Sequence, residues 1–496
     1  MTTDRWIGTW WRSDQPEDQA HGELTWTERA RLEIHPGLAH VPMQIRGDEV
    51  HRYPAIHGLT ADGKQVTLLD CMSVRRNIGM IPVLGVQSEV IASNCLLIGA
   101  HLEPDVLFEE ARFEVPGLEQ WLPQAHLDQT FIGAEGGFEC SVRVNAPPDE
   151  QVEVPGVGTV SWKVHRHLSG IQVPVATIRT STHIGLRPAE PENLEWYLTQ
   201  WNRIATLLTF AWGSMVGSRA VVAKGDGTPV EIRVKLSESG PCPHAHRNEF
   251  FLPKSAPDFD FNAVLQSWLQ RDAVVDMPAR LARSVLSAEH GWVHTEFLSL
   301  MQALEGFHRA LYPGSYMAEQ DYQEDCDAMI RAMPARIAGD HRTSLKNRLR
   351  YGNQISLRRR LKDLCDSLPP DVLKLVLGGR TAPPPRWVTT RNYYTHWDEE
   401  SRADILDDQE LAAACLRLRV LLSVLYLHYA EVPEGVLIKA LCGTSPLAQH
   451  LIHLNSIEIR RRDPTSRAGV LAEITPAHSG QAPADESDAE SADPTA

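Results

Sequence analysis

The residue types best suited to chemistry in this sequence stand close together in Arg391-Asn392-Tyr393-Tyr394-Thr395-His396. An Arg and a His separated by four residues is weak evidence alone, because the 496 residues contain this spacing four times. The segment differs from the other matches because Asn directly follows the Arg and because it closes a basic stretch. The other three matches are Arg46/His51, Arg52/His57 and Arg336/His341.

The three side chains of Arg391, Asn392 and His396 suit the cleavage of RNA by its own 2′-hydroxyl. Histidine titrates near neutral pH, so His396 could act as a general base or a general acid. Arg391 stays charged and offers a planar fork to the charge that develops on the phosphate. Asn392 could orient His396 or the phosphate. The products would be a 2′,3′-cyclic phosphate and a 5′-hydroxyl, and two such sets could supply both the acid and the base.

The local sequence predicts that these residues lie on a helix. A helix that begins near Thr389 or Thr390 would have a capping hydroxyl at its start. Asn392 and His396 would then share one face at i, i+4, with Arg391 in the first turn. The alternative is structural: the Arg and the Asn could pair locally while the His packs at a helix interface.

The charge pattern around this segment favours a nucleic-acid partner. The chain carries a net charge of −16, yet residues 341–396 hold 12 Lys and Arg against 3 Asp and Glu, a net of +9. A local positive field can attract phosphates whatever the overall charge. The RNA-binding candidates are the basic side chains of this stretch and two tyrosines that could stack on unpaired bases: Arg348, Arg350, Arg358, Arg359, Arg360, Lys362, Tyr393 and Tyr394. A solvated helix face and two packed tyrosines are the competing interpretation.

At this point the sequence resembles the ApeA-like proteins of the HEPN superfamily. The sharp match is Arg391–His396, and a second match is the stretch Met301–Arg309. Looser matches in the N-terminal half are Gly22-Glu23-Leu24-Thr25, Ile56-His57-Gly58 and Gln120-Trp121-Leu122.

The resemblance implies an RNA endonuclease of prokaryotic anti-phage defence that acts as a toxin by abortive infection. It implies catalysis without a metal or other cofactor, and a homodimer in which two copies of the motif form one composite site. The β-rich region would then be the sensor that restrains the nuclease until an unknown phage-derived trigger or inhibitor acts. Glu305, His308 and Arg309 lie at i, i+3 and i+4 and could support the site from a second helix, or form a salt-bridged helix face.

Two other functions compete with this hypothesis. The first is a non-catalytic HEPN module that serves as a dimerising scaffold or nucleotide binder, against which the intact Arg391, Asn392 and His396 argue. The second is a ligand-binding or carbohydrate-binding protein centred on the β-rich half. Four tryptophans there could be platforms for sugar rings if they are exposed: Trp10, Trp11, Trp26 and Trp121. The alternative is that all four lie in the core.

Metal-ligand spacing is sparse in this sequence. Cys242, His244 and His246 alternate along a segment that, if extended, would place them on one face, but no fourth ligand stands nearby. His165 and His167 are a weaker pair. No P-loop, no HExxH, no nucleophile elbow and no dinucleotide-binding glycine pattern occurs.

The element pattern predicts an α+β multidomain protein. A β-rich N-terminal domain with one long helix, Glu192–Trp212, is expected over residues 1–275, as one domain or two. A helical bundle follows over residues 276–460, and residues 461–496 form a linker and a disordered acidic tail. We expect a cytoplasmic protein without a membrane partner, because the longest mostly apolar run, Val420–Leu427, is short and residues 1–11 lack a signal-peptide core.

Overall fold

A computed structural model describes the chain over most of its length. The described residues are 4–38, 51–78, 86–122, 126–134, 137–145, 150–172, 175–218, 220–225, 228–234, 247–287, 292–397 and 399–462. The predicted acidic tail and the Cys242/His244/His246 grouping therefore lie outside the described residues. The chain divides into two compact units, residues 1–289 with 426–432, and residues 290–425 with 433–496. The predicted boundary after residue 275 falls inside the first unit, at the start of a helix.

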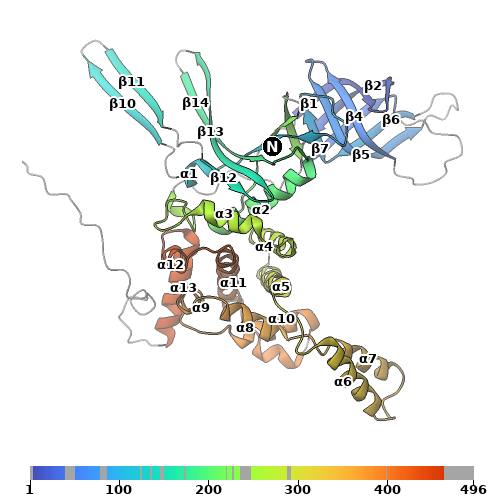
Figure 1. The fold of residues 1–496 in the computed structure, drawn as a ribbon, viewed down its shortest axis with the longest axis vertical. Coiled ribbons are helices and arrows are strands. Elements are labelled where there is room, and N and C mark those ends of the chain that lie inside the picture. The colour runs from blue at the N-terminus through green and yellow to red at the C-terminus, as the bar shows by residue number, and fades with distance from the viewer. Residues whose placement is uncertain are drawn as a thin grey trace, which may run out of the picture. The chain divides into compact units, whose positions relative to one another are not determined.

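Six antiparallel strands at the start of the first unit close into a barrel (Figure 1). They pair in the order β5-β4-β1-β2-β3-β6, and β6 returns to pair with β5, so that the ring has no open edge. Their bounds are β1 Asp4–Arg12, β2 Gln15–Trp26, β3 Ala30–His35, β4 Arg52–Thr60, β5 Gln65–Ile78 and β6 Val86–Ser93.

Alternating side chains fill the barrel. In β3, Ala30, Leu32 and Ile34 are buried while the residues between them are exposed, which is the period of two expected for a strand with one face inward. Trp10 lies fully buried in this core. Trp121 is also buried, whereas Trp11 and Trp26 are partly exposed. Trp10 and Trp121 are therefore core residues, as one of the two interpretations of these tryptophans predicted.

The same sheet continues beyond the barrel through β7, which pairs with β5. The order from there is β7-β17-β16-β9-β14-β13-β12. The bounds are β7 Cys95–Ile98, β9 Glu110–Glu114, β12 Glu150–Val154, β13 Gly158–Gln172, β14 Val175–Arg187, β16 Ala220–Gly225 and β17 Thr228–Val234. Two smaller pairs complete the described strands: β8 Leu107–Phe108 with β15 Glu192–Asn193, and β10 His126–Ala134 with β11 Gly137–Asn145.

The long helix of the first unit packs on this sheet. Helix α2, Leu194–Trp212, begins where the Asn193 side chain accepts a hydrogen bond from the Trp196 amide, and it ends at Gly213 with φ 73°. The Trp201 ring stacks on Phe113 of β9 at 4.7 Å between centroids. Three further helices of this unit are α1 Leu118–Trp121, α3 Phe261–Gln270 and α4 Asp276–Ser287.

The second unit is helical throughout its described length. Its helices are α5 Val293–Leu311, α6 Glu319–Ala332, α7 Gly339–Arg350, α8 Leu357–Asp366, α9 Pro370–Leu377, α10 Pro385–His396, α11 Asp408–Tyr429, α12 Glu434–Leu441 and α13 Pro446–Arg462. Helices α5, α8 and α10 pack against one another. Helices α6 and α7 form a hairpin that extends from the other helices of this unit (Figure 1).

Helix α11 contains the apolar run Val420–Leu427 and extends beyond it in both directions. Among the described residues, it is the helix that has the length and hydropathy to cross a membrane. Most of it is buried by the protein itself, as in the core helix of a bundle. Its last turn belongs to the first unit, where Tyr426 stacks on Phe210 at 4.5 Å between ring centroids.

Candidate active site

Helix α10 carries the predicted catalytic segment, but it begins earlier than expected. Its first residue is Pro385, a position that tolerates proline because the missing amide would have no helical partner. The predicted caps at Thr389 or Thr390 are therefore wrong, and Arg391 lies in the second turn instead of the first. Thr390 is fully buried, and its hydroxyl accepts a hydrogen bond from the Leu406 amide at 3.0 Å. This bond ties α10 to the start of the segment that leads into α11.

The three predicted catalytic side chains come from neighbouring turns of α10, where Asn392 and His396 face solvent and Arg391 contacts both Asn392 and Glu305 of α5. Asn392 and His396 are both exposed and one helical turn apart, as predicted. Arg391 is partly exposed and donates from Nη1 to Oδ1 of Asn392 at 3.2 Å. His396 makes no hydrogen bond within the part of the chain that the structure describes. A phosphate could therefore approach a guanidinium, an amide and an imidazole from one side.

Glu305 on α5 holds the Arg391 guanidinium. Its Oε2 lies 3.5 Å from Nη2 of Arg391, while its Oε1 accepts from Arg309 at 2.9 Å. The Glu305 side chain is 19% exposed, and that of Arg391 is 29% exposed. The Glu305 carboxylate is thus partly shielded from solvent. It orients the Arg391 guanidinium, which stays partly exposed. Glu305 and Arg309 lie where a supporting second helix was predicted.

His308 points into the packing between α5 and α8 instead of the open side. It is fully buried, its Nδ1 accepts from Arg360 at 3.2 Å, and its Nε2 donates to Asp363 at 3.3 Å. This pairing requires the neutral Nε2–H tautomer. Burial lowers the pKa of His308, and the neighbouring Arg360 acts in the same direction against the opposing effect of Asp363.

The prediction that Arg360 contacts RNA from the protein surface is wrong. Its side chain is buried between α5 and α8, where it donates to His308, and burial lowers its pKa. The apolar stripe of α8, Leu361, Leu364 and Cys365, turns this one arginine inward with it.

The other basic candidates differ in whether they form an ion pair with an acidic side chain. Arg359 pairs with Asp363 at 2.8 Å, and Lys362 pairs with Asp366. Three exposed arginines form no ion pair with any described residue: Arg348 and Arg350 at the end of α7, and Arg358 at the start of α8. These three are the cations of the set that remain available to phosphate groups.

The two tyrosines of the segment are packed to different degrees. Tyr393 is buried, so the prediction that it stacks on a base is wrong. Tyr394 is partly exposed, meets His294 edge-on at 4.8 Å between centroids, and has its pKa raised by burial. Both tyrosines meet the ring of Trp397, an exposed residue that the sequence analysis did not single out.

Two protein-family models match the chain that carries this site. A family model described as "ApeA N-terminal domain 1" matches residues 5–268, more than half of the chain. A second, described as "Apea-like HEPN", matches residues 298–435 and thus covers both α10 and Glu305.

The chain belongs to the ApeA-like HEPN proteins. Searches of curated proteins and of solved structures each found no match. HEPN domains are generally nucleases, commonly dimerise and bind RNA, and the ApeA-like type suggests a protein of anti-phage defence. The expected β-rich N-terminal domain followed by a helical HEPN region is confirmed.

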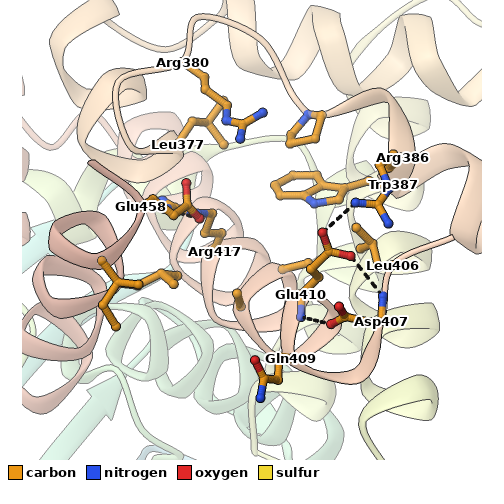
Figure 2. Close-up of a pocket in the computed structure, with 15 residues that line it drawn as sticks. Leu377, Arg380, Arg386, Trp387, Leu406, Asp407, Gln409, Glu410, Arg417 and Glu458 are labelled. Atoms are coloured by element: carbon orange, nitrogen blue, oxygen red, sulfur yellow. Dashed lines mark hydrogen bonds and ion pairs between the residues drawn. The ribbon is translucent and has the colours of Figure 1, made fainter. Parts of the chain in front are cut away.

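The HEPN domain also contains a cavity of about 530 Å³ that the sequence did not predict (Figure 2). Arg386 and Trp387, from the first turn of α10, line it, whereas Arg391, Asn392 and His396 do not. Two ion pairs lie in its wall, Arg386 with Glu410 at 2.6 Å and Arg417 with Glu458 at 3.1 Å, and Arg380 also lines it. The cavity is therefore separate from the candidate catalytic residues, although one helix borders both.

No group of three or more His, Cys, Asp or Glu side chains within the described ranges is arranged to hold a metal ion. The predicted grouping of Cys242, His244 and His246 falls outside those ranges, so it stays a prediction.

Proposed function

We propose that this ApeA-like HEPN protein is a metal-independent endoribonuclease of anti-phage defence that acts by abortive infection. The observation that carries the proposal is the exposure of Asn392 and His396 on one face of α10, with Arg391 bonded to Asn392 and oriented by Glu305. These residue types supply proton transfer and charge stabilisation themselves.

Each side chain has a distinct role in this proposal. His396 removes the proton from the 2′-hydroxyl or delivers one to the leaving 5′-oxygen. Arg391 stabilises the charge that develops on the phosphate oxygens. Asn392 accepts a hydrogen bond from Arg391 and so helps to orient the guanidinium. The 2′-oxygen forms the new bond to phosphorus as the 5′-oxygen leaves, which yields a 2′,3′-cyclic phosphate and a 5′-hydroxyl.

The reaction needs both an acid and a base, and one motif offers one histidine. We therefore propose a homodimer through the HEPN domain, in which the two copies of His396 share these tasks. This proposal draws on the common dimerisation of HEPN domains.

We propose that the N-terminal domain restrains the nuclease in a healthy cell and responds to a phage-derived trigger in the cytoplasm, with no membrane involved. A toxin that cleaves RNA requires such restraint, and the N-terminal domain, matched over residues 5–268, lies outside the HEPN match of residues 298–435.

The ends of the cleaved RNA test the proposed chemistry. An oligoribonucleotide would be incubated with the protein and EDTA, and its products separated and analysed by mass spectrometry. The proposal predicts 2′,3′-cyclic phosphate and 5′-hydroxyl ends, and full resistance of a 2′-O-methylated strand. Products with 3′-hydroxyl and 5′-phosphate ends, or cleavage of the methylated strand, would contradict attack by the 2′-oxygen.

A further inference from the structure

Trp397 is an exposed aromatic residue at the candidate active site. It directly follows His396, and its side chain is 69% exposed. Trp387, the other tryptophan of the HEPN-matched residues 298–435, is buried, whereas Trp292, just before α5, is 75% exposed. Exposing an indole to water has a free-energy cost that the fold alone does not require.

The backbone of Trp397 adds a second cost. Its φ and ψ are 52° and 44°, the left-handed conformation that bulky residues rarely adopt. Helices α2 and α9 end in the same conformation with glycine, Gly213 and Gly378, whereas the chain after α11 uses Glu431, with φ 68°. A bulky residue kept where glycine would fit better suggests a role in function.

The indole is also held in place. The Trp397 amide donates to the Tyr393 carbonyl at 2.6 Å, and its ring meets those of Tyr393 and Tyr394 edge-on, at 5.8 Å and 6.4 Å between centroids. Tyr394 in turn packs against His294 of α5. The ring thus stands at the end of α10 on an aromatic base, beside the imidazole of His396.

We propose that Trp397 is the platform on which an unpaired base next to the scissile phosphate stacks. This inference rests on the proposed ribonuclease function, because His396 then marks the position of the phosphate. Neighbouring residues are about 3.8 Å apart at Cα, so an indole beside His396 reaches the nucleotide next to the cleaved bond. Every base offers a π-face, but only an unpaired base can leave its helix to stack on a protein ring.

The inference specifies the substrate class: single-stranded RNA, or a loop or end within a folded RNA, cut beside a base that is held by stacking. The competing occupant of this surface is a second copy of the chain, which would cover the indole in a dimer. The two occupants predict different effects of the same substitutions.

The test compares Trp397→Ala with Trp397→Phe, and uses Met277→Ala of α4 as the control, because Met277 is similarly exposed, at 68%. Binding of a short single-stranded RNA is measured with each change placed in a His396→Ala background, and cleavage in the otherwise unchanged chain. Loss of one stacked base should weaken binding roughly tenfold or more in Trp397→Ala. Trp397→Phe should restore most of it, and Met277→Ala should match the parent.

A further variant separates function from structure. Trp397→Gly should melt no lower than the parent, since glycine relieves the left-handed backbone, yet it should bind RNA as poorly as Trp397→Ala. Unchanged RNA binding by Trp397→Ala, or a dimer that dissociates in sedimentation when Trp397 is replaced, would overturn the inference. Absence of cleavage by the unsubstituted chain would instead refute the proposed nuclease, whatever Trp397 does.

Discussion

At the scale of single residues, the orientation of Arg391 depends on one carboxylate. We predict that Glu305→Gln slows RNA cleavage roughly two- to fivefold, because a partly exposed ion pair contributes about 1 kcal/mol or less and the substitution keeps the size of the side chain. Initial rates at saturating RNA measure the effect. Glu296→Gln is the matched control, since Glu296 lies on the same helix and pairs with Arg419. Equal cleavage rates for both variants would contradict the role of Glu305 in orienting Arg391.

The sequence could predict that Asn392 and His396 share one face of a helix, because a helix places residues at i and i+4 on one face whatever surrounds it. It could not predict that Arg360 turns inward, because only the burial of its neighbours on α8 decides which arginine of a basic run leaves solvent. It also gave no sign of Trp397. A left-handed helix end normally signals itself with glycine, and here that residue is absent.

At the scale of elements, the hydroxyl of Thr390 joins α10 to the segment before α11. We predict that Thr390→Val destabilises the protein by about 1–3 kcal/mol, because the buried amide of Leu406 would lose its acceptor. Urea unfolding followed by circular dichroism measures this loss. Thr389→Val is the control, because Thr389 is partly exposed and forms no hydrogen bond through its side chain to any described residue. Equal stability of both variants would contradict the role of this bond.

The contact between α5 and α8 makes stability depend on pH through His308. Its lowered pKa keeps it neutral in the folded state, while the unfolded chain binds a proton below its usual pKa of about 6.5. The unfolded state then holds more protons, so the stability contributed here is complete above that pH and falls as the pH drops.

We predict that His308→Gln reduces the loss of melting temperature between pH 7.5 and pH 5, as calorimetry at both pH values would measure. His450→Gln, an exposed histidine of α13, should leave the loss unchanged. The same dependence on pH in all three proteins would refute a linkage through His308.

Periodicity predicted most helices of the HEPN domain, because each has an apolar face. The pattern placed the start of α10 too late, since Pro385, Arg386 and Trp387 read as the end of a loop. Prolines alone do not reveal that the chain continues as a helix from this position.

At the scale of the whole molecule, a protein with a net charge of −16 must bind a polyanion through a local surface. We predict that a triple variant in which Arg348, Arg350 and Arg358 are each replaced by Gln shows a weaker salt dependence of RNA binding. The slope of log K against log[salt] should fall in magnitude by about 2, for three lost contacts with a single strand. The slope is measured by fluorescence anisotropy over a series of salt concentrations. The same loss of charge on the barrel, in Arg29, Arg31 and Arg52, should leave the slope unchanged.

The closure of the barrel lay beyond prediction from sequence. Short strands and turns indicated a β-rich region, yet the barrel closes through the pairing of β6 with β3, two segments far apart in the chain, and no local pattern encodes that pairing. The order of a β-rich half and a helical half could be predicted, because the period of the apolar residues changes between them.

The most direct test of the central claim is RNA cleavage in EDTA by the unsubstituted protein and by three variants. Arg391→Ala and His396→Ala remove the proposed catalytic groups. His341→Ala is the control, because Arg336 and His341 have the same spacing but Arg336 lies in a turn before α7. The account predicts that the parent and His341→Ala cleave RNA, while Arg391→Ala and His396→Ala fold but lose about 10²-fold or more of the rate. Cleavage at equal rates by all four proteins would contradict it.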